Sequence, residues 1–178
     1  DTATELATRA LELSERWYGP YDPRLSILID VLADAARKRG RVDEAMALYR
    51  RNLGLHRSRD SERLQIPKLE ANLAIATVEQ GDFAGAAPMA ARALAGLEQR
   101  YGPEHPLLVQ ALVLTGYIAR ERPDPDLASS ARDLERAVAI GEAKLGPDHT
   151  ETINAEIELA NTQVAMGQAP SAVERLER

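Results

Sequence analysis

The sequence predicts an all-α protein, built as a solenoid of antiparallel helix hairpins. Three linkers of similar sequence support this fold class: YGPYDP at 18–23, YGPEHP at 101–106 and LGPDHT at 145–150. Their prolines stand 83 and 44 residues apart, which corresponds to two periods and one period of a unit about 42 residues long. Repetition at that period is typical of helical solenoids, in which each unit buries its apolar face against its neighbours.

A turn divides each unit into two helices. Gly40, Gly81 and Gly167 each end one helical segment, and a similar phrase follows each of them: RVDEA, DFAGA and QAPSA. Glycine ends helices because it accepts a left-handed backbone conformation. In the third unit the turn is RPDPD at 122–126, where prolines interrupt the helix instead.

Nine helices are expected in chain order. Within them apolar residues recur at intervals of three and four, as in Leu25, Leu28 and Leu32. The first helix is the second half of a unit and the last is clipped, so we expect an excised piece of a longer protein. One repeat domain over 1–178 would comprise 1–19, 20–59, 60–102, 103–146 and 147–178. The expected helices are 2–17, 24–39, 42–57, 63–80, 82–100, 105–121, 126–145, 150–166 and 169–178.

Small residues recur where the two helices of a hairpin must cross closely. Alanines separated by twelve residues occur in three units, at 33 and 45, 74 and 86, and 160 and 172. The third unit has Gly116 with Ser130 fourteen residues later, consistent with an insertion of two residues in its turn. Larger side chains at these positions would push the paired helices apart.

Composition excludes several classes of protein. The net charge of −6 opposes nucleic-acid binding, and the absence of cysteine excludes disulfides and thiolate metal sites. No apolar run approaches the roughly 18 to 20 residues of a membrane span. We therefore expect a cytoplasmic protein with no nucleic-acid or membrane partner. The excess of arginine over lysine, together with abundant alanine, suggests a GC-rich bacterial source.

The alanine pattern Ala-x11-Ala resembles that of tetratricopeptide repeats. The linker Tyr/Leu-Gly-Pro-Asp/Glu-His, with its period near 42, is similar to the longer repeats of kinesin light chains, above all at 145–149 (LGPDH). The resemblance implies a right-handed superhelix with a concave groove that binds peptides. Two departures are visible, because the linker 58–67 lacks Gly-Pro and the asparagine-rich inner face survives mainly as Asn72 and Asn161. A motor-cargo role is therefore not implied.

The sequence contains no recognisable catalytic motif. It has no glycine-rich phosphate loop, no His-Glu-x-x-His and no Gly-x-Ser-x-Gly. His105 and His149 occupy the same position in successive linkers, which favours a repeated turn over a metal site. We expect neither an enzyme nor a cofactor.

A concave binding surface follows from the resemblance, which implies that the first helix of each hairpin lines the groove. Positions three and six before the small residue of each unit, and one and four after it, would face the groove. Val113, Tyr117 and Ile157 would hold an apolar side chain of a peptide, the asparagines would bond its backbone, and Arg120 would pair with a carboxylate. The alternative is that these are solvated inner-face residues. The selected peptide-binding residues are Asp30, Asp34, Arg37, Lys68, Asn72, Val113, Tyr117, Arg120, Asn154, Ile157 and Asn161.

These observations favour a non-catalytic protein–protein interaction module within a larger bacterial protein. One alternative is a peptide-sensing regulatory domain of a signalling protein. Another is a self-assembly module, in which Val173 and Leu176 of the last helix help to complete an intermolecular stack and form a homo-oligomer.

Overall fold

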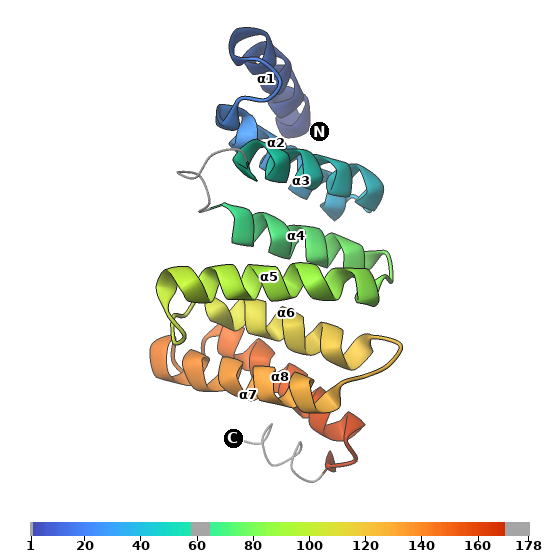
Figure 1. The fold of residues 1–178 in the computed structure, drawn as a ribbon, viewed down its shortest axis with the longest axis vertical. Helices are drawn as coiled ribbons and strands as arrows, with labels where there is room; N and C mark the ends of the chain where they lie inside the picture. Colours follow the sequence, from blue (N-terminus) through green and yellow to red (C-terminus); the bar gives the residue numbers. More distant parts are fainter. Residues whose placement is uncertain (1, 58–64, 170–178) are drawn as a thin grey trace. The chain divides into compact units, whose positions relative to one another are not determined.

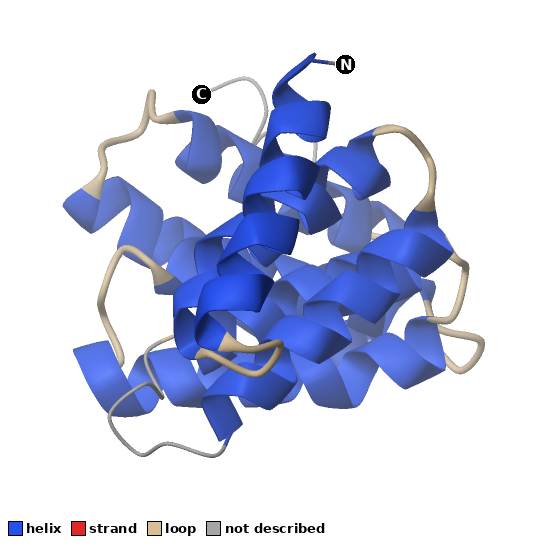
Figure 2. Cartoon of the chain, turned by 90° about the horizontal axis from the view of Figure 1, so that it is seen from above, coloured by secondary structure: helices blue, strands red, loops and turns tan. Residues whose placement is uncertain are grey.

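The computed structural model describes residues 2–57 and 65–169, and in this part of the chain it contains helices and no strand (Figures 1 and 2). The all-α prediction is confirmed. A short 3-10 helix, η1 (Pro23–Leu25), precedes α2. The α-helices are α1 (Thr2–Tyr18), α2 (Ser26–Lys38), α3 (Val42–Arg57), α4 (Ile66–Glu79), α5 (Phe83–Tyr101), α6 (Leu108–Glu121), α7 (Leu127–Lys144) and α8 (Thr150–Ala165).

The helix boundaries follow the local signals of the sequence. Gly40 and Gly81 adopt φ angles of 73° and 81° at the ends of α2 and α4, a conformation that glycine accepts readily. Asp82 and Asp126 cap α5 and α7, because their side chains accept hydrogen bonds from backbone N–H groups three residues later. The ninth expected helix, 169–178, and most of the linker 58–67 lie outside the described residues.

Two helices begin later than expected. Helix α4 begins at Ile66 rather than at residue 63, with Pro67 in its first turn, where the missing N–H of proline costs nothing. Helix α6 begins at Leu108 rather than at residue 105, because Pro106 and its neighbours form a turn. In that turn the Nδ1 atom of His105 accepts a hydrogen bond from the N–H of Leu107 at 3.3 Å.

The chain divides into two compact units, residues 1–81 and 82–178. The first unit contains α1 to α4, and each helix packs against the next. Ala33 on α2 and Ala45 on α3 are both fully buried, in agreement with a close crossing of these two helices. The apolar core of this unit comprises Ala7, Leu11, Leu25, Ile29, Leu32 and Leu55.

The second unit contains α5 to α8, and α6 contacts α5, α7 and α8. A Cβ atom at Gly116 of α6 would lie 2.6 Å from the Cγ atom of Leu134 on α7, so these helices approach too closely for a side chain at this position. Gly141 of α7 approaches Thr152 of α8 in the same way, at 2.7 Å from its Oγ1 atom. The core residues are Leu108, Val109, Leu112, Leu134, Ala137, Val138, Ile140, Ala155 and Leu159.

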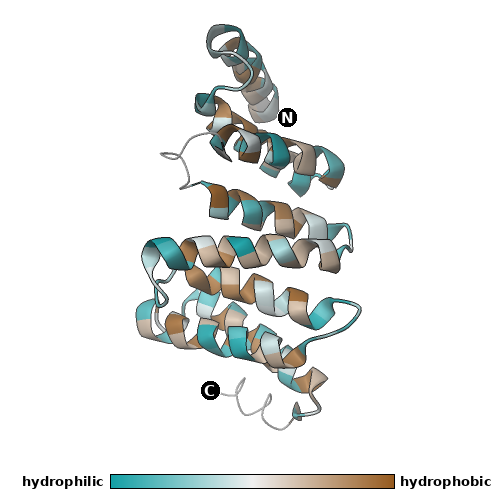
Figure 3. Cartoon of the chain, viewed as in Figure 1, coloured by the Kyte–Doolittle hydropathy of each residue, from teal (hydrophilic) through white to brown (hydrophobic). Residues whose placement is uncertain are grey.

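Hydrophobic and hydrophilic residues alternate along the helices of both units (Figure 3). This pattern is the amphipathic periodicity by which each helix buries one face against its neighbours. The boundary between the units follows Gly81 and falls inside the expected hairpin 60–102, whose two helices therefore belong to different units. The single repeat domain over 1–178 stays a prediction.

Candidate functional site

The charged candidates of the first unit are paired with one another or with neighbouring residues. Lys68 Nζ of α4 lies 2.5 Å from Asp30 Oδ2 of α2, and Arg37 Nη1 of α2 lies 2.7 Å from Glu79 Oε1 of α4. Both pairs join helices about one repeat apart in the sequence. The structure thus brings together Asp30 and Lys68, which were selected independently, and adds Glu79, which was not. Asn72 is half-buried on α4, where it lies between Lys68 and Glu79.

Asp34 is engaged by a buried tyrosine. The hydroxyl group of Tyr49, a fully buried residue of α3, donates a hydrogen bond to Asp34 Oδ1. Burial, followed by this hydrogen bond to a carboxylate, raises the pKa of Tyr49 above its usual value of 10.0. Both acidic candidates of the first unit, Asp30 and Asp34, are therefore engaged by partners within the chain.

Arg120 of α6 holds α8 in place. Its Nη2 atom lies 2.8 Å from Glu158 Oε2, and its Nη1 atom donates to the Glu158 carbonyl at 3.1 Å. Its Nε atom donates to Glu121 at 2.8 Å, and only 10% of the side chain is exposed. A ligand carboxylate would have to displace these partners. The contacts therefore favour a structural role for Arg120 over the predicted role in ligand binding.

Tyr117 lies one turn before Arg120 on the same helix. Its ring centroid is 6.1 Å from that of Phe83 on α5 in a tilted arrangement, and the Arg120 guanidinium lies 5.3 Å from the Tyr117 ring. Val113, one further turn back, is half-buried and packs against the core of the unit. These two residues provide apolar surface on α6 that is only partly covered.

Helix α8 carries the most open part of the predicted site. Asn154, Ile157, Asn161 and Val164 are separated by three, four and three residues, so they form one stripe along the helix. All four are exposed, with 43% of Ile157 and 56% of Val164 accessible. The stripe therefore offers amide groups and apolar side chains in alternation.

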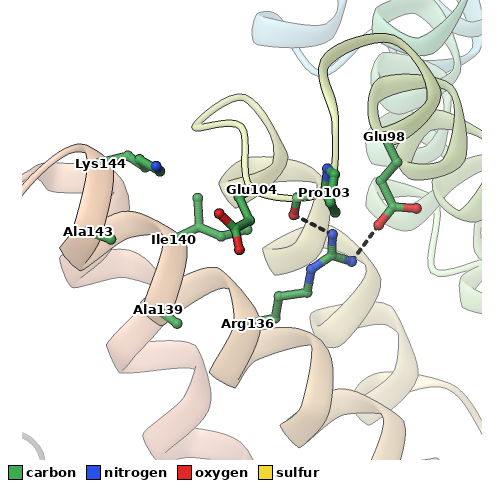
Figure 4. Close-up of a pocket in the computed structure, with 8 residues that line it drawn as sticks. All are labelled: Glu98, Pro103, Glu104, Arg136, Ala139, Ile140, Ala143 and Lys144. Carbon is green, nitrogen blue, oxygen red and sulfur yellow. Dashed lines mark hydrogen bonds and ion pairs between the residues drawn. The ribbon is translucent and has the colours of Figure 1, made fainter.

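A cavity of about 600 Å³ lies elsewhere in the second unit, where α7 faces the end of α5 and the linker after it (Figure 4). Arg136 points from α7 toward this linker, donates to the Pro103 carbonyl at 2.6 Å and pairs with Glu98. Sequence reasoning missed this cavity. Its lining residues are Glu98, Pro103, Glu104, Arg136, Ala139, Ile140, Ala143 and Lys144.

The same arginine contact occurs in the first unit and offers the signal that sequence reasoning overlooked. Arg51 of α3 lies 2.5 Å from Glu15 of α1 and donates to the Pro20 carbonyl at 3.0 Å. Arg51 and Arg136 both follow the small residue of their hairpin by six positions. In both units an arginine on the second helix of the hairpin thus binds a carbonyl of the Gly-Pro linker that precedes the hairpin.

The second linker histidine also has a structural role, because His149 Nδ1 accepts a hydrogen bond from the N–H of Glu151 at 3.2 Å. Among residues 2–57 and 65–169, no group of three His, Asp or Glu side chains is placed to hold a metal ion. No helix in the same part of the chain is long and apolar enough to cross a bilayer.

Comparison with known proteins identifies the repeat. Residues 71–107 match the model of the tetratricopeptide repeat family. The chain therefore contains a tetratricopeptide repeat in this segment. No curated protein matches the sequence.

Several solved structures share the fold of this chain. A putative kinesin light chain of P. anserina with nearly identical TPR-like repeats has a TM-score of 0.83 at 22% identity, and the match covers 99% of this chain and 82% of that one. BtubC (BKLC) of P. vanneervenii has a TM-score of 0.78 at 20% identity, with 88% and 63% covered. The apo form of RapI has a TM-score of 0.75 at 12% identity, with 85% and 53% covered. The prediction of a helical repeat solenoid is therefore confirmed.

The chain spans less than two thirds of the length of BtubC and of RapI. Its repeats are of the kind that form extended surfaces for protein interaction rather than enclosed reactive pockets. Within the second unit, α6 and α8 contact one another as the first helices of successive repeats. The exposed stripe of α8 and the half-buried residues of α6 therefore lie on neighbouring helices.

Proposed function

We propose that the chain is a non-catalytic interaction module that binds an extended peptide segment of a partner protein along α6 and α8. The observation that carries the proposal is the exposed stripe of Asn154, Ile157, Asn161 and Val164. Its charged neighbours, Arg120 and Glu158, are already paired. A ligand can therefore reach amide and apolar groups here without breaking an ion pair.

The spacing of the two asparagines suits an extended peptide. Asn154 and Asn161 are seven residues apart, which corresponds to roughly 10 Å along a helix. Three residues of extended chain cover about the same distance. Each amide can thus bond the backbone of the peptide at positions three residues apart, while Ile157 and Val164 contact the side chains of the peptide.

The first unit offers a weaker site. Asp30, Asp34 and Arg37 would each have to leave a partner within the chain before they contacted a ligand. Their contacts instead fix α2 against α3 and α4. We therefore assign the main peptide contacts to the second unit, with Asn72 and the exposed amine of Lys68 as peripheral candidates.

The proposal is tested with a random peptide library, selected against the parent chain and then measured against Asn161→Ala and Ile157→Asp. Each substitution removes a contact at an exposed position, so we expect helicity to be unchanged and affinity to fall about tenfold. Glu135→Ala, at an exposed position of α7, is the control and should bind like the parent. Selected peptides that bind the first two variants as tightly as the parent would refute the assignment of this surface.

The location in the cytoplasm, the place within a larger bacterial protein and self-assembly stay predictions from the sequence.

A further inference from the structure

Carboxylates lie at both ends of the contact between α6 and α8, the two helices to which peptide binding is assigned. At the end of α6, the Nη2 atom of Arg120 lies 2.8 Å from Glu158 Oε2 of α8, and its Nε atom donates to Glu121 Oε1 at 2.8 Å. One guanidinium thus serves two carboxylates. This end of the contact therefore keeps one net negative charge.

The other end carries a carboxylate whose partner is neutral. Glu151 Oε1, in the first turn of α8, accepts a hydrogen bond from the side-chain amide of Gln110 on α6 at 2.5 Å. This amide donates a hydrogen bond but brings no charge. The N-terminus of α8 offers only about half an elementary charge, spread over several N–H groups. An excess of negative charge therefore remains at this end too.

Apolar surface separates the two acidic ends. On α6, Val113 and Tyr117 follow Gln110 at intervals of three and four residues, so they lie on the same face of the helix. On α8, 43% of Ile157 is exposed. The surface is therefore apolar in its middle and acidic at both ends. Both acidic ends belong to contacts between two helices of the second unit, so they do not depend on residues outside 82–169.

Each acidic end also places a carboxylate beside an exposed asparagine. Glu151 precedes Asn154 by three residues, and Glu158 precedes Asn161 by three residues. Side chains at this spacing are neighbours on a helix surface. A ligand residue whose backbone is bonded by the asparagine amide can therefore extend its side chain to the carboxylate.

The charge of the sequence is concentrated in the same unit. Residues 82–178 contain 15 acidic and 9 basic residues, whereas residues 1–81 contain 13 of each. The whole net charge of −6 therefore belongs to the second unit. A field of this sign attracts cationic ligands and repels anionic ones.

We propose that the peptide bound along α6 and α8 is basic. Two lysine or arginine side chains, three positions apart in the peptide, pair with Glu151 at one end and with Glu121 and Glu158 at the other. The peptide residues between them are apolar. The proposal rests on the peptide-binding function proposed above, and adds the charge of the ligand and the spacing of its charged residues.

The spacing of the two cations follows from the helix. Glu151 and Glu158 are seven residues apart, which corresponds to roughly 10 Å along α8. In the polyproline II conformation, residues three positions apart lie on the same side of the chain and about 9 Å apart. Two cationic side chains at this spacing therefore reach both carboxylates at once.

Neither cation has to displace a partner within the chain. Arg120 contacts Oε2 of Glu158 and Oε1 of Glu121, and the second oxygen of each carboxylate can accept a further hydrogen bond. The side chains of Glu121 and Glu158 are 41% and 21% exposed, so a ligand can reach both. An acidic peptide would instead meet carboxylates at both ends, and Arg120 is already shared between two of them.

The first test uses the peptides selected from the random library against the parent chain. Those whose binding depends on Asn161 and Ile157 should be enriched in pairs of lysine or arginine three positions apart. Peptides that depend on these two residues but carry no such excess would overturn the basic character of the ligand and leave the proposed function standing. A library that yields no peptide dependent on them would overturn both.

The second test uses three synthetic peptides with capped ends: GSKLVKSG, and its analogues with both lysines replaced by glutamine or by glutamate. Fluorescence anisotropy should show that the lysine peptide binds the parent chain about tenfold more tightly than the glutamine peptide, because each exposed ion pair contributes up to about fivefold. The glutamate peptide should bind most weakly. The advantage of the lysine peptide should shrink as salt is raised, because salt screens exposed charges.

Variants of the full chain show where the lysine peptide binds. Glu151→Gln still accepts a hydrogen bond from Gln110, and it should weaken the lysine peptide about threefold while leaving the glutamine peptide unchanged. Glu121→Gln should have the same effect at the other end. Glu135→Gln removes an equal charge from an exposed position of α7 and should leave binding unchanged.

Two results would overturn the proposal. One is equal binding of the three peptides to the parent chain. The other is a loss of affinity in Glu135→Gln as large as that in Glu151→Gln, because the attraction would then be a general effect of net charge.

Discussion

The close approach of α6 and α7 leads to a prediction whose sign depends on one neighbouring side chain. Gly116 lies in the interior of α6, where alanine is ordinarily the better helix former by about 1 kcal/mol. A Cβ atom there would, however, lie 2.6 Å from the Cγ atom of Leu134 and 3.1 Å from both of its methyl carbons. Leu134 is fully buried in the core of the second unit, where side chains are closely packed.

These two effects can be compared in magnitude. Overpacking of a dense core typically costs about 1–3 kcal/mol, which exceeds the gain of about 1 kcal/mol in helix propensity. Gly116→Ala should therefore lower the free energy of unfolding by about 1 kcal/mol. For a chain of this size, that change corresponds to a decrease in Tm of about 2–4 °C.

The assay is thermal and urea unfolding followed by circular dichroism, with two controls. Gly54→Ala lies on the exposed side of α3 with no atom within 4 Å of the new Cβ atom, so it should raise stability by about 1 kcal/mol. In a Leu134→Ala background the obstacle is gone, and Gly116→Ala should become stabilising by a similar amount. If Gly116→Ala stabilises the parent chain as much as Gly54→Ala does, the close crossing of α6 and α7 is wrong.

Two further predictions concern buried hydroxyl groups and a helix cap. The hydroxyl of Thr152 is buried without a hydrogen-bond partner, so Thr152→Val should leave the urea midpoint unchanged or raise it. Thr162→Val, in contrast, removes the 2.9 Å hydrogen bond to the buried hydroxyl of Ser130 and should lower the free energy of unfolding by about 1–3 kcal/mol. A midpoint that falls equally in both valine variants would contradict this difference. Hydrogen bonds from Ser129 hold the pKa of Asp126 in the folded chain below its usual value of 3.8. The Asp126 carboxylate therefore stabilises the folded chain fully above pH 3.8, and this contribution is lost as the pH falls through the lowered pKa. The stability difference between the parent and Asp126→Asn should therefore shrink on acidification below pH 3.8; a difference that stays constant down to the lowest pH at which the chain folds would contradict this role.

Local chemistry determines much of the fold. Glycines at the helix ends, aspartates at the helix starts and the spacing of apolar residues all act within a few residues of the chain. They therefore predict eight helices, to within three residues at each end. The small residue at Gly116 likewise marks a close crossing, because steric exclusion at a crossing acts on any larger side chain.

The candidate site could be predicted only in part. The spacing of Asn154, Ile157 and Asn161 places them on one stripe of a helix, and the structure leaves that stripe exposed. The sequence does not indicate that Arg120 is already bound by Glu158, because both residues carry the pattern of solvent-facing charges. Their separation of 38 residues, close to one repeat, is the signal that could have paired them.

The sequence by itself thus determined the helices, their turns, the period of the repeat and the positions where helices cross. Only the tertiary structure decided which charges neutralise one another, that Arg136 reaches the linker carbonyl of Pro103, and that Trp17 stays exposed. The physical reason is that helix formation and amphipathic spacing are encoded by neighbours along the chain. The partner of a side chain, in contrast, is set by which residues of other helices lie within a few ångströms of it once the repeats have packed.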